Sequence, residues 1–269
     1  MIKEMINSGL GKFGYKVVRL DPYALSSRDG FFDPRVFKYD EAVQYIVGLH
    51  VAPEDQIRKA SIPEGSLEYL SNFFKDCFTG NKPLVALHVG NFVGISLVWL
   101  ASCLKRFHKD SLVVSIDPNI SHLGVRYPLD VVTRIANYYS LQKNILFLVG
   151  YSLESNLRND VGTLQSDSHR NLKPDISFEN VLKNLTLLSH GNYDLALMDG
   201  NHDASYLRRE IDCLYDLLGE RGLLVLDDVS DYWQQRAGLK DVYEEINKTR
   251  FVKEGTDGRV GVLRKKVNK

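Results

Sequence analysis

Hydrophobic and polar positions follow two alternating periods from residue 83 onward. Continuous apolar runs of strand length are followed by segments with helical spacing, as Leu207, Ile211 and Leu214 illustrate. Runs that are apolar at every position predict strands buried on both faces, which are typical of parallel sheets. The predicted strands are 83–90, 111–117, 144–150, 194–200 and 223–228. The predicted helices between and after them are 94–107, 129–142, 178–190 and 205–220.

The two ends of the chain depart from this alternation. Residues 1–80 lack it and predict an N-terminal helical cap on the substrate side, with helices near 40–48 and 65–78. After the fifth strand we expect a helix near 238–248. Two short strands then flank Asp257-Gly258, which is a strong hairpin signal.

These elements together predict the fold class. Strands that alternate with helices indicate a parallel sheet covered on both faces. The prediction is a Rossmann-like, doubly wound α/β fold with a mostly parallel sheet of seven strands and a C-terminal antiparallel hairpin. The chain is expected to divide into the cap at 1–80 and a second domain at 81–269. The polar stretch 159–175 is longer than a connection requires, so we expect it to form a lid.

Composition and charge narrow the possible partners. Lys plus Arg equals Asp plus Glu at 34 each, so the chain has no net positive field for a polyanion, and nucleic acid is not expected as a partner. No apolar run has the length of a transmembrane segment. Three cysteines in apolar segments indicate reduced core thiols and a cytoplasmic protein. The sequence also allows a homo-oligomer.

The carboxyl ends of the predicted strands hold the candidate chemistry, because ligands of open parallel sheets bind there. Gly90 and Gly94 frame a turn that leads into a helix, where a ligand can approach bare backbone and the positive helix N-terminus. Asp117 ends the next strand and could accept both hydroxyls of a ribose. The alternatives are a tight turn at the glycines and an Asp that starts a turn before Pro118. Ser152 could read a purine edge or cap a helix.

Acidic residues end two further strands. Asp199, Asp227 and Asp228 supply hard oxygen ligands that suit Mg²⁺. Neighbouring side chains on a regular strand point to opposite faces, so Asp227 and Asp228 converge only if the strand ends there. His202 follows Asp199 by three residues and could act as a general base. Alternatively, Asp199 caps the next helix and Asp227 binds the backbone of a neighbouring loop.

The segment 84–265 resembles class I S-adenosylmethionine-dependent methyltransferases, specifically the metal-dependent O-methyltransferases, which include catechol O-methyltransferase and sugar and natural-product enzymes. The stretches that carry the resemblance are HVGNFVGISLVWLA, SIDPN, VGYS, LMDGNHD and LLVLDDV. The resemblance implies that residues 81–269 bind S-adenosylmethionine. The cofactor-binding positions that it implies are Gly90, Asn91, Gly94, Ser96, Asp117, Ser152 and Asp199. It further implies a divalent cation, Mg²⁺ or another, at Asp199, Asp227 and Asp228.

Two positions depart from the family pattern. His88 stands where the first motif usually has Glu or Asp, and Tyr151 stands where an Asp is common. Both changes predict altered contacts with the cofactor. The ribose anchor at Asp117 is retained.

The function predicted from the sequence is S-adenosylmethionine-dependent, metal-assisted methylation of a hydroxyl on a small molecule or saccharide, with His202 as the catalytic base. Two alternatives stay open. A metal-dependent hydrolase would also use clustered Asp and His, but it would leave the glycine turn and Asp117 without a role. A catalytically silent methyltransferase-like protein would bind the cofactor or a partner without turnover.

Overall fold

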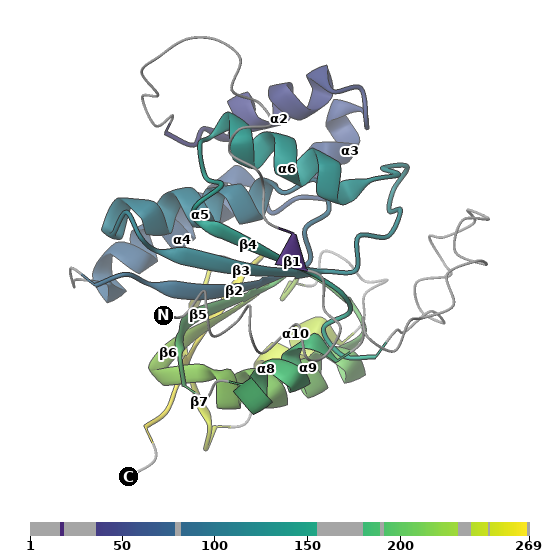
Figure 1. Cartoon of the computed structure of the whole chain (residues 1–269). Helices are drawn as coiled ribbons and strands as arrows, with labels where there is room; N and C mark the ends of the chain where they lie inside the picture. The colour runs from purple at the N-terminus through teal and green to yellow at the C-terminus, as the bar shows by residue number, and fades with distance from the viewer. Residues whose placement is uncertain are drawn as a thin grey trace.

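A single mixed β-sheet with helices on both faces organises the chain (Figure 1). The computed structural model describes residues 17–18, 36–78, 82–154, 180–188, 191–230, 238–246 and 248–267. The stretch 159–175, predicted to form a lid, lies outside these residues, as does most of the chain before residue 36.

The described part of the sheet has eight strands in the order β1-β4-β3-β2-β5-β6-β8-β7. The strands from β2 to β6 pair in parallel, whereas β8 pairs antiparallel with β6 and β7. The strands are β1 (Val17–Val18), β2 (Val85–Val89), β3 (Leu112–Asp117), β4 (Ile145–Val149), β5 (Tyr193–Met198), β6 (Leu218–Leu226), β7 (Phe251–Thr256) and β8 (Gly261–Lys265). The seven predicted strands and the C-terminal hairpin are confirmed. The two-residue β1, antiparallel to β4, was not predicted.

The helices lie near the positions predicted from the hydrophobic periodicity, and one short helix is additional. They are α2 (Tyr39–Gly48), α3 (Glu54–Lys59), α4 (Glu64–Cys77), α5 (Ile95–Phe107), α6 (Pro128–Tyr138), α8 (Val181–Leu188), α9 (Ala204–Leu217) and α10 (Leu239–Glu244). The short α3 was not predicted. The helix predicted at 205–220 ends at Leu217, because residues 218–220 already belong to β6 and Gly219 is a poor helix former.

Apolar runs on the central strands bury side chains on both faces of the sheet. Leu223 and Val225 point into a hydrophobic cluster with α2, α4, α5 and α6. Their neighbours Leu224 and Leu226 point into a second cluster with α8, α9 and α10. Figure 1 shows these two groups of helices on opposite sides of the sheet. A strand that faces two cores has no polar face, which explains why its sequence does not alternate.

The N-terminal helices share the first of these clusters with α5 and α6. The indole of Trp99 on α5 donates a hydrogen bond of 3.1 Å to the Ser71 hydroxyl on α4. The Tyr138 hydroxyl on α6 donates one of 2.6 Å to Glu41 on α2. The division at residue 80 stays a prediction. Among the described residues, no helix combines the length and hydrophobicity that crossing a membrane requires.

Candidate active site

The carboxyl ends of β2, β5 and β6 meet at one edge of the sheet. Beyond the strands themselves, the Asp199 N–H donates to the Val89 carbonyl at 2.9 Å, and the Asp227 N–H donates to the Met198 carbonyl at 3.0 Å. These bonds extend the parallel ladders by one residue and hold the predicted site residues of three strands side by side.

The turn after β2 requires glycine at two positions. Gly90 and Gly94 have φ of +89° and +88°, in the left-handed region that L side chains rarely adopt. A Cβ built on Gly90 would lie 2.0 Å from the Asp199 carbonyl oxygen, and one on Gly94 would lie 3.1 Å from the Val132 side chain. The turn is therefore pressed against β5 on one side and α6 on the other.

Asp117, the predicted ribose anchor, ends β3 beside this turn. Its Oδ2 accepts the Asn91 N–H at 2.8 Å, and its Oδ1 accepts the Asn119 N–H at 2.7 Å. Burial raises the pKa of Asp117, and the two backbone hydrogen bonds oppose this effect. The bond from Asn119 is the predicted turn contact. Each carboxylate oxygen keeps a second lone pair, so turn formation and diol binding are compatible.

Asn91 is fixed by its side chain as well as by its backbone. Its Oδ1 accepts the Ser115 hydroxyl at 2.7 Å, and the residue is buried. The first residue of the glycine turn is thus attached to the interior of β3. This attachment holds the turn and Asp117 in one fixed arrangement.

The Ser96 hydroxyl faces the core. It lies 3.0 Å from Nε2 of His88, and both side chains are buried between β2 and α5. Contacts of Ser96 with a cofactor would therefore come from its backbone. Burial lowers the pKa of His88 to about 3, so the imidazole is neutral. His88, at the position where the resemblance implies an acidic residue, belongs to the interior.

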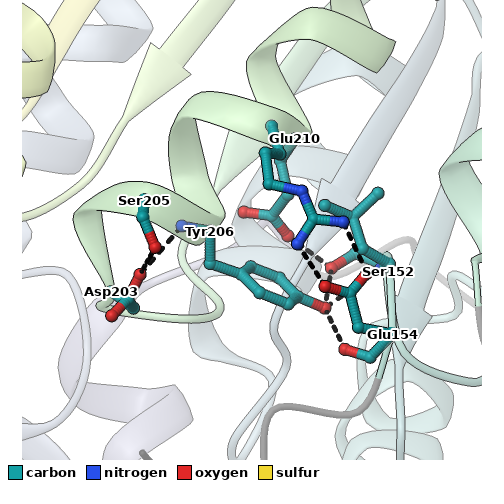
Figure 2. Close-up of polar contacts among 8 residues, drawn as sticks. Ser152, Glu154, Asp203, Ser205, Tyr206 and Glu210 are labelled. Carbon is teal, nitrogen blue, oxygen red and sulfur yellow. Dashed lines mark hydrogen bonds and ion pairs between the residues drawn. The ribbon is translucent and has the colours of Figure 1, made fainter.

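The Ser152 side chain likewise forms part of a buried hydrogen-bond network (Figure 2). Its hydroxyl contacts the carboxyl of Glu210 and lies 3.2 Å from the Tyr206 hydroxyl. The Tyr206 oxygen also accepts the Leu153 N–H at 3.0 Å and donates to the Glu154 carbonyl at 3.0 Å. This network joins the end of β4 to α9, and the Ser152 carbonyl accepts the Leu182 N–H at 2.9 Å, so the Ser152 side chain serves packing.

Sequence reasoning missed Glu210, although its position offered a signal. It follows Leu207 by three residues and precedes Leu214 by four, on the buried stripe of α9. Burial raises the pKa of Glu210 to about 8, which leaves the carboxyl protonated at neutral pH. Its Oε2 has no hydrogen-bond partner in the part of the chain that the structure describes.

The acidic cluster forms where β6 ends, as predicted. Asp227 and Asp228 follow the last strand residue, and Asp228 has φ of +58°, which breaks the strand geometry and lets both carboxylates converge. Sequence reasoning missed the residue between them. The Arg259 guanidinium binds both oxygens of Asp227 at 2.8 Å and lies 2.7 Å from Oδ1 of Asp228. Asp227 therefore pairs with the side chain of a distant residue.

Asp199 lies against the same cluster. Burial and the carboxylates of Asp227 and Asp228 raise its pKa well above the usual range. It does not cap the following helix, because Asp203 is the N-cap of α9 and accepts the Tyr206 N–H at 2.8 Å. Within the described ranges, no three His, Cys, Asp or Glu side chains are arranged to hold a metal ion.

His202 lies at the rim of the cluster. Its Nδ1 is 3.1 Å from Oδ2 of Asp228, and about a third of its side chain (32%) is exposed. A small cavity of about 10 Å³ separates these groups from α9, and its lining includes Asp199, Asp227, His202 and Glu210. A larger cavity of about 700 Å³ lies between α2, α4 and α5 and contains none of the predicted site residues. Asp199, Asp227 and His202 therefore line the smaller cavity and not the larger one.

Comparison with solved structures gives the same fold at low sequence identity. An O-methyltransferase from Bacillus cereus in complex with SAH has a TM-score of 0.52 and 13% identity over 100% of both chains. The SAH-bound methyltransferase PaMTH1 of Podospora anserina has a TM-score of 0.52 and 14% identity, covering 91% of this chain and 93% of that one. TomG of Streptomyces achromogenes is an O-methyltransferase involved in tomaymycin synthesis and was solved with SAM. It has a TM-score of 0.50 and 13% identity, covering 91% of this chain and 93% of that one.

Sequence comparison identifies the family. No curated protein matches the chain in sequence. A family model described as a methyltransferase domain matches residues 87–229, which is more than half of the chain and spans the strand ends from β2 to β6. The resemblance to class I methyltransferases is confirmed in family and in fold, and the chain belongs to the methyltransferase domain family.

Proposed function

We propose that the protein transfers a methyl group from S-adenosylmethionine to a hydroxyl oxygen of a small molecule or saccharide. The observation that carries this proposal is the junction of Asp117 with the glycine turn, where the Asn91 N–H and the Asp117 carboxylate meet at 2.8 Å. A carboxylate with unused lone pairs beside a glycine turn suits a ribose diol and the amino acid portion of a nucleoside cofactor.

The residues present fit this cofactor by their chemistry. Gly90 and Gly94 leave the backbone bare at the start of α5, and Asp117 supplies the diol acceptor. The side chains of Asn91, Ser96 and Ser152 are bound inside the protein, and the Asn91 N–H and the Ser152 carbonyl also have partners, so these residues would reach the cofactor only through backbone groups that such bonds leave. Asp199 follows β5 at the same edge. When bound, S-adenosylmethionine supplies an electrophilic methyl group on its sulfonium.

His202 is the proposed general base. A neutral alcohol is a poor nucleophile, so its proton must leave as the new oxygen–carbon bond forms. An ionised Asp228 can only accept a hydrogen bond, so Nδ1 of His202 is the donor across the 3.1 Å contact. The proton-free nitrogen is then Nε2, which can take the hydroxyl proton of the acceptor.

The proposed methyl transfer does not depend on the magnesium ion that the sequence predicts. Asp199, Asp227 and Asp228 have the oxygen donors that Mg²⁺ prefers. Their arrangement does not fit a metal site, because Arg259 binds both oxygens of Asp227 and contacts Asp228. Metal dependence stays a prediction from sequence, and the proposed reaction has no step that involves a metal.

Membership of the methyltransferase family favours this function over a metal-dependent hydrolase. A catalytically silent relative is the remaining competitor, since His88 and Tyr151 depart from the family pattern. The buried His88–Ser96 pair shows that the first of these departures lies in the core. The two functions differ in turnover and not in cofactor binding.

Binding of S-adenosylhomocysteine, measured by calorimetry, tests the cofactor site. We expect Asp117→Asn to weaken binding by about 1–3 kcal/mol, because the ribose hydroxyls lose a charged acceptor. Asp110→Asn, at an exposed ion pair with Lys109, is the matched control and should bind like the wild type. Equal affinities in all three proteins would show that Asp117 does not bind the ribose. Product detection with labelled cofactor and a panel of phenols and sugars then separates the enzyme from a silent relative.

A further inference from the structure

Arg259 fills the position in which the sequence predicted a metal ion. We propose that this guanidinium is the permanent counter-cation of the acidic cluster and replaces a divalent metal, so that the site operates without one. The inference rests on the proposed function, because it concerns the same active site. It follows from four features of Arg259: its partners, its burial, its backbone anchoring and its effect on His202.

The guanidinium uses the oxygens that a metal would need. It binds Oδ1 and Oδ2 of Asp227 through Nε and Nη2, both at 2.8 Å, and Nη1 lies 2.7 Å from Oδ1 of Asp228. Such a two-pronged contact matches the planar fork of arginine. A divalent ion would have to displace a cation that is tethered to the chain and cannot lose its proton.

The ion pairs are shielded from water. The exposed fraction of the side chain is 19% for Arg259, 2% for Asp227 and none for Asp228. Charges at such depth require a partner, because an unpaired buried carboxylate is strongly destabilising. One guanidinium between two carboxylates supplies that partner from within the fold.

The backbone of the β7–β8 hairpin holds Arg259 in this position. The Asp257 carboxylate accepts the Arg259 N–H at 2.8 Å, and Gly258 has φ of +94°, which completes the tight turn. The Arg259 carbonyl accepts the N–H of Val229, the residue next to Asp228, at 3.0 Å. The hairpin tip is thus attached to the end of β6, and the arginine is built into the site.

This arrangement makes Arg259 a positioning residue for His202. Asp228 uses one oxygen for Arg259 and the other for Nδ1 of His202. A fixed, ionised Asp228 holds the ring in the tautomer that carries its proton on Nδ1. A metal in the same place would do this by coordination, whereas here the arginine does it by an ion pair.

The test compares divalent cation binding in the wild type and in Arg259→Met, which keeps an apolar stem and removes the charge. Mn²⁺ binding is followed by electron paramagnetic resonance, and Mg²⁺ by its effect on the melting temperature. We expect the wild type to bind neither ion and to keep its S-adenosylhomocysteine affinity in chelator. Arg259→Met should gain Mn²⁺ binding, and saturating Mg²⁺ should raise its melting temperature by about 4 °C or more. Arg264→Met, on the same hairpin and paired with Glu254, should gain neither property.

Two results would overturn the inference. One is saturable Mn²⁺ binding by the wild type that Asp227→Asn abolishes, and the other is a folded Arg259→Met protein that binds no divalent ion. If Arg259→Met does not fold, Arg259→Met combined with Asp227→Asn and Asp228→Asn removes both carboxylates that lose their partner, and recovery of folding supports the counter-cation. Failure of this triple variant to recover contradicts it. Wild-type cofactor binding reports on the proposed function separately.

Discussion

The backbone of Gly90 touches the backbone of Asp199. A methyl group at position 90 would lie 2.0 Å from the Asp199 carbonyl oxygen and 2.6 Å from the Cα of Gly200. The contact joins the proposed cofactor turn after β2 to the acidic cluster after β5. Neither loop can move away from the strands without breaking this contact, so the proposed cofactor turn and the acidic cluster are held at a fixed separation.

Replacing Gly90 should therefore lower the free energy of unfolding by more than replacing a glycine that has only a positive φ. Gly90→Ala places a side chain in the left-handed region, at about 1–2 kcal/mol, and adds a clash with rigid backbone. Gly124→Ala is the control, because Gly124 has φ of +80° but no heavy atom within 4 Å of its added Cβ. Urea unfolding should show a clearly larger loss for Gly90→Ala. Equal losses would mean that the loops separate readily.

The ion pair of Asp227 with Arg259 should contribute measurably to folding. Breaking a buried pair typically costs about 3–5 kcal/mol, but Asp227→Asn also relieves repulsion with Asp199, so we expect a net loss of roughly 2 kcal/mol. Asp212→Asn breaks the exposed pair with Arg250, and its effect should stay below about 1 kcal/mol. Chemical unfolding at neutral pH measures both. A stabilised Asp227→Asn protein would show that repulsion in the cluster outweighs the ion pair.

His202 should matter for turnover and not for cofactor binding. Its side chain contacts Asp228 and lies at the rim of the small cavity, outside the glycine turn. His202→Gln should lower kcat by about 10²- to 10⁴-fold, which is the usual contribution of a positioned base. S-adenosylhomocysteine affinity should stay at the wild-type value. His50→Gln, at a position just after α2 and remote from the site in sequence, is the control for losing a histidine.

The strands could be predicted because their signal is local. Residues 223–226 are apolar throughout, and the structure buries them on two faces. The ends of such strands lie at one edge of the sheet, which is why the sequence predicts Asp117, Asp199 and Asp227 as neighbours at that edge. The helix α3 was missed because it has six residues and buries only Ile57, which is too short for a periodic pattern.

The partners of the site residues could not be predicted, because they come from distant parts of the chain. Arg259 lies 32 residues after Asp227, and only the closed hairpin brings them together. The Ser152 hydroxyl meets Glu210, 58 residues away. Packing between elements decides which carboxylate pairs with an arginine and which serine bonds to a carboxyl group. Sequence position alone gives the strand end, and tertiary structure decides which atoms stay available for a ligand.

The buried Glu210 predicts a specific dependence of stability on pH. Burial raises its pKa from the usual 4.5 to about 8. The folded protein therefore keeps the proton to a higher pH than the unfolded chain, which releases it near 4.5. Stability from this group is complete below pH 4.5 and falls as the pH rises to 8. Glu210→Gln has no proton to release, so it should lack this fall.

Urea unfolding of wild type and Glu210→Gln between pH 4.5 and 9 measures the effect. We expect the two proteins to be similar at pH 4.5. The variant should be more stable at pH 8, by on the order of a few kcal/mol, since each tenfold change in proton affinity corresponds to about 1.4 kcal/mol. The amide can still bond to Ser152 and so preserves the network in Figure 2. Glu68→Gln, on the exposed face of α4, controls for the loss of one carboxylate. A stability difference that is the same at every pH would mean that Glu210 ionises normally in the folded protein.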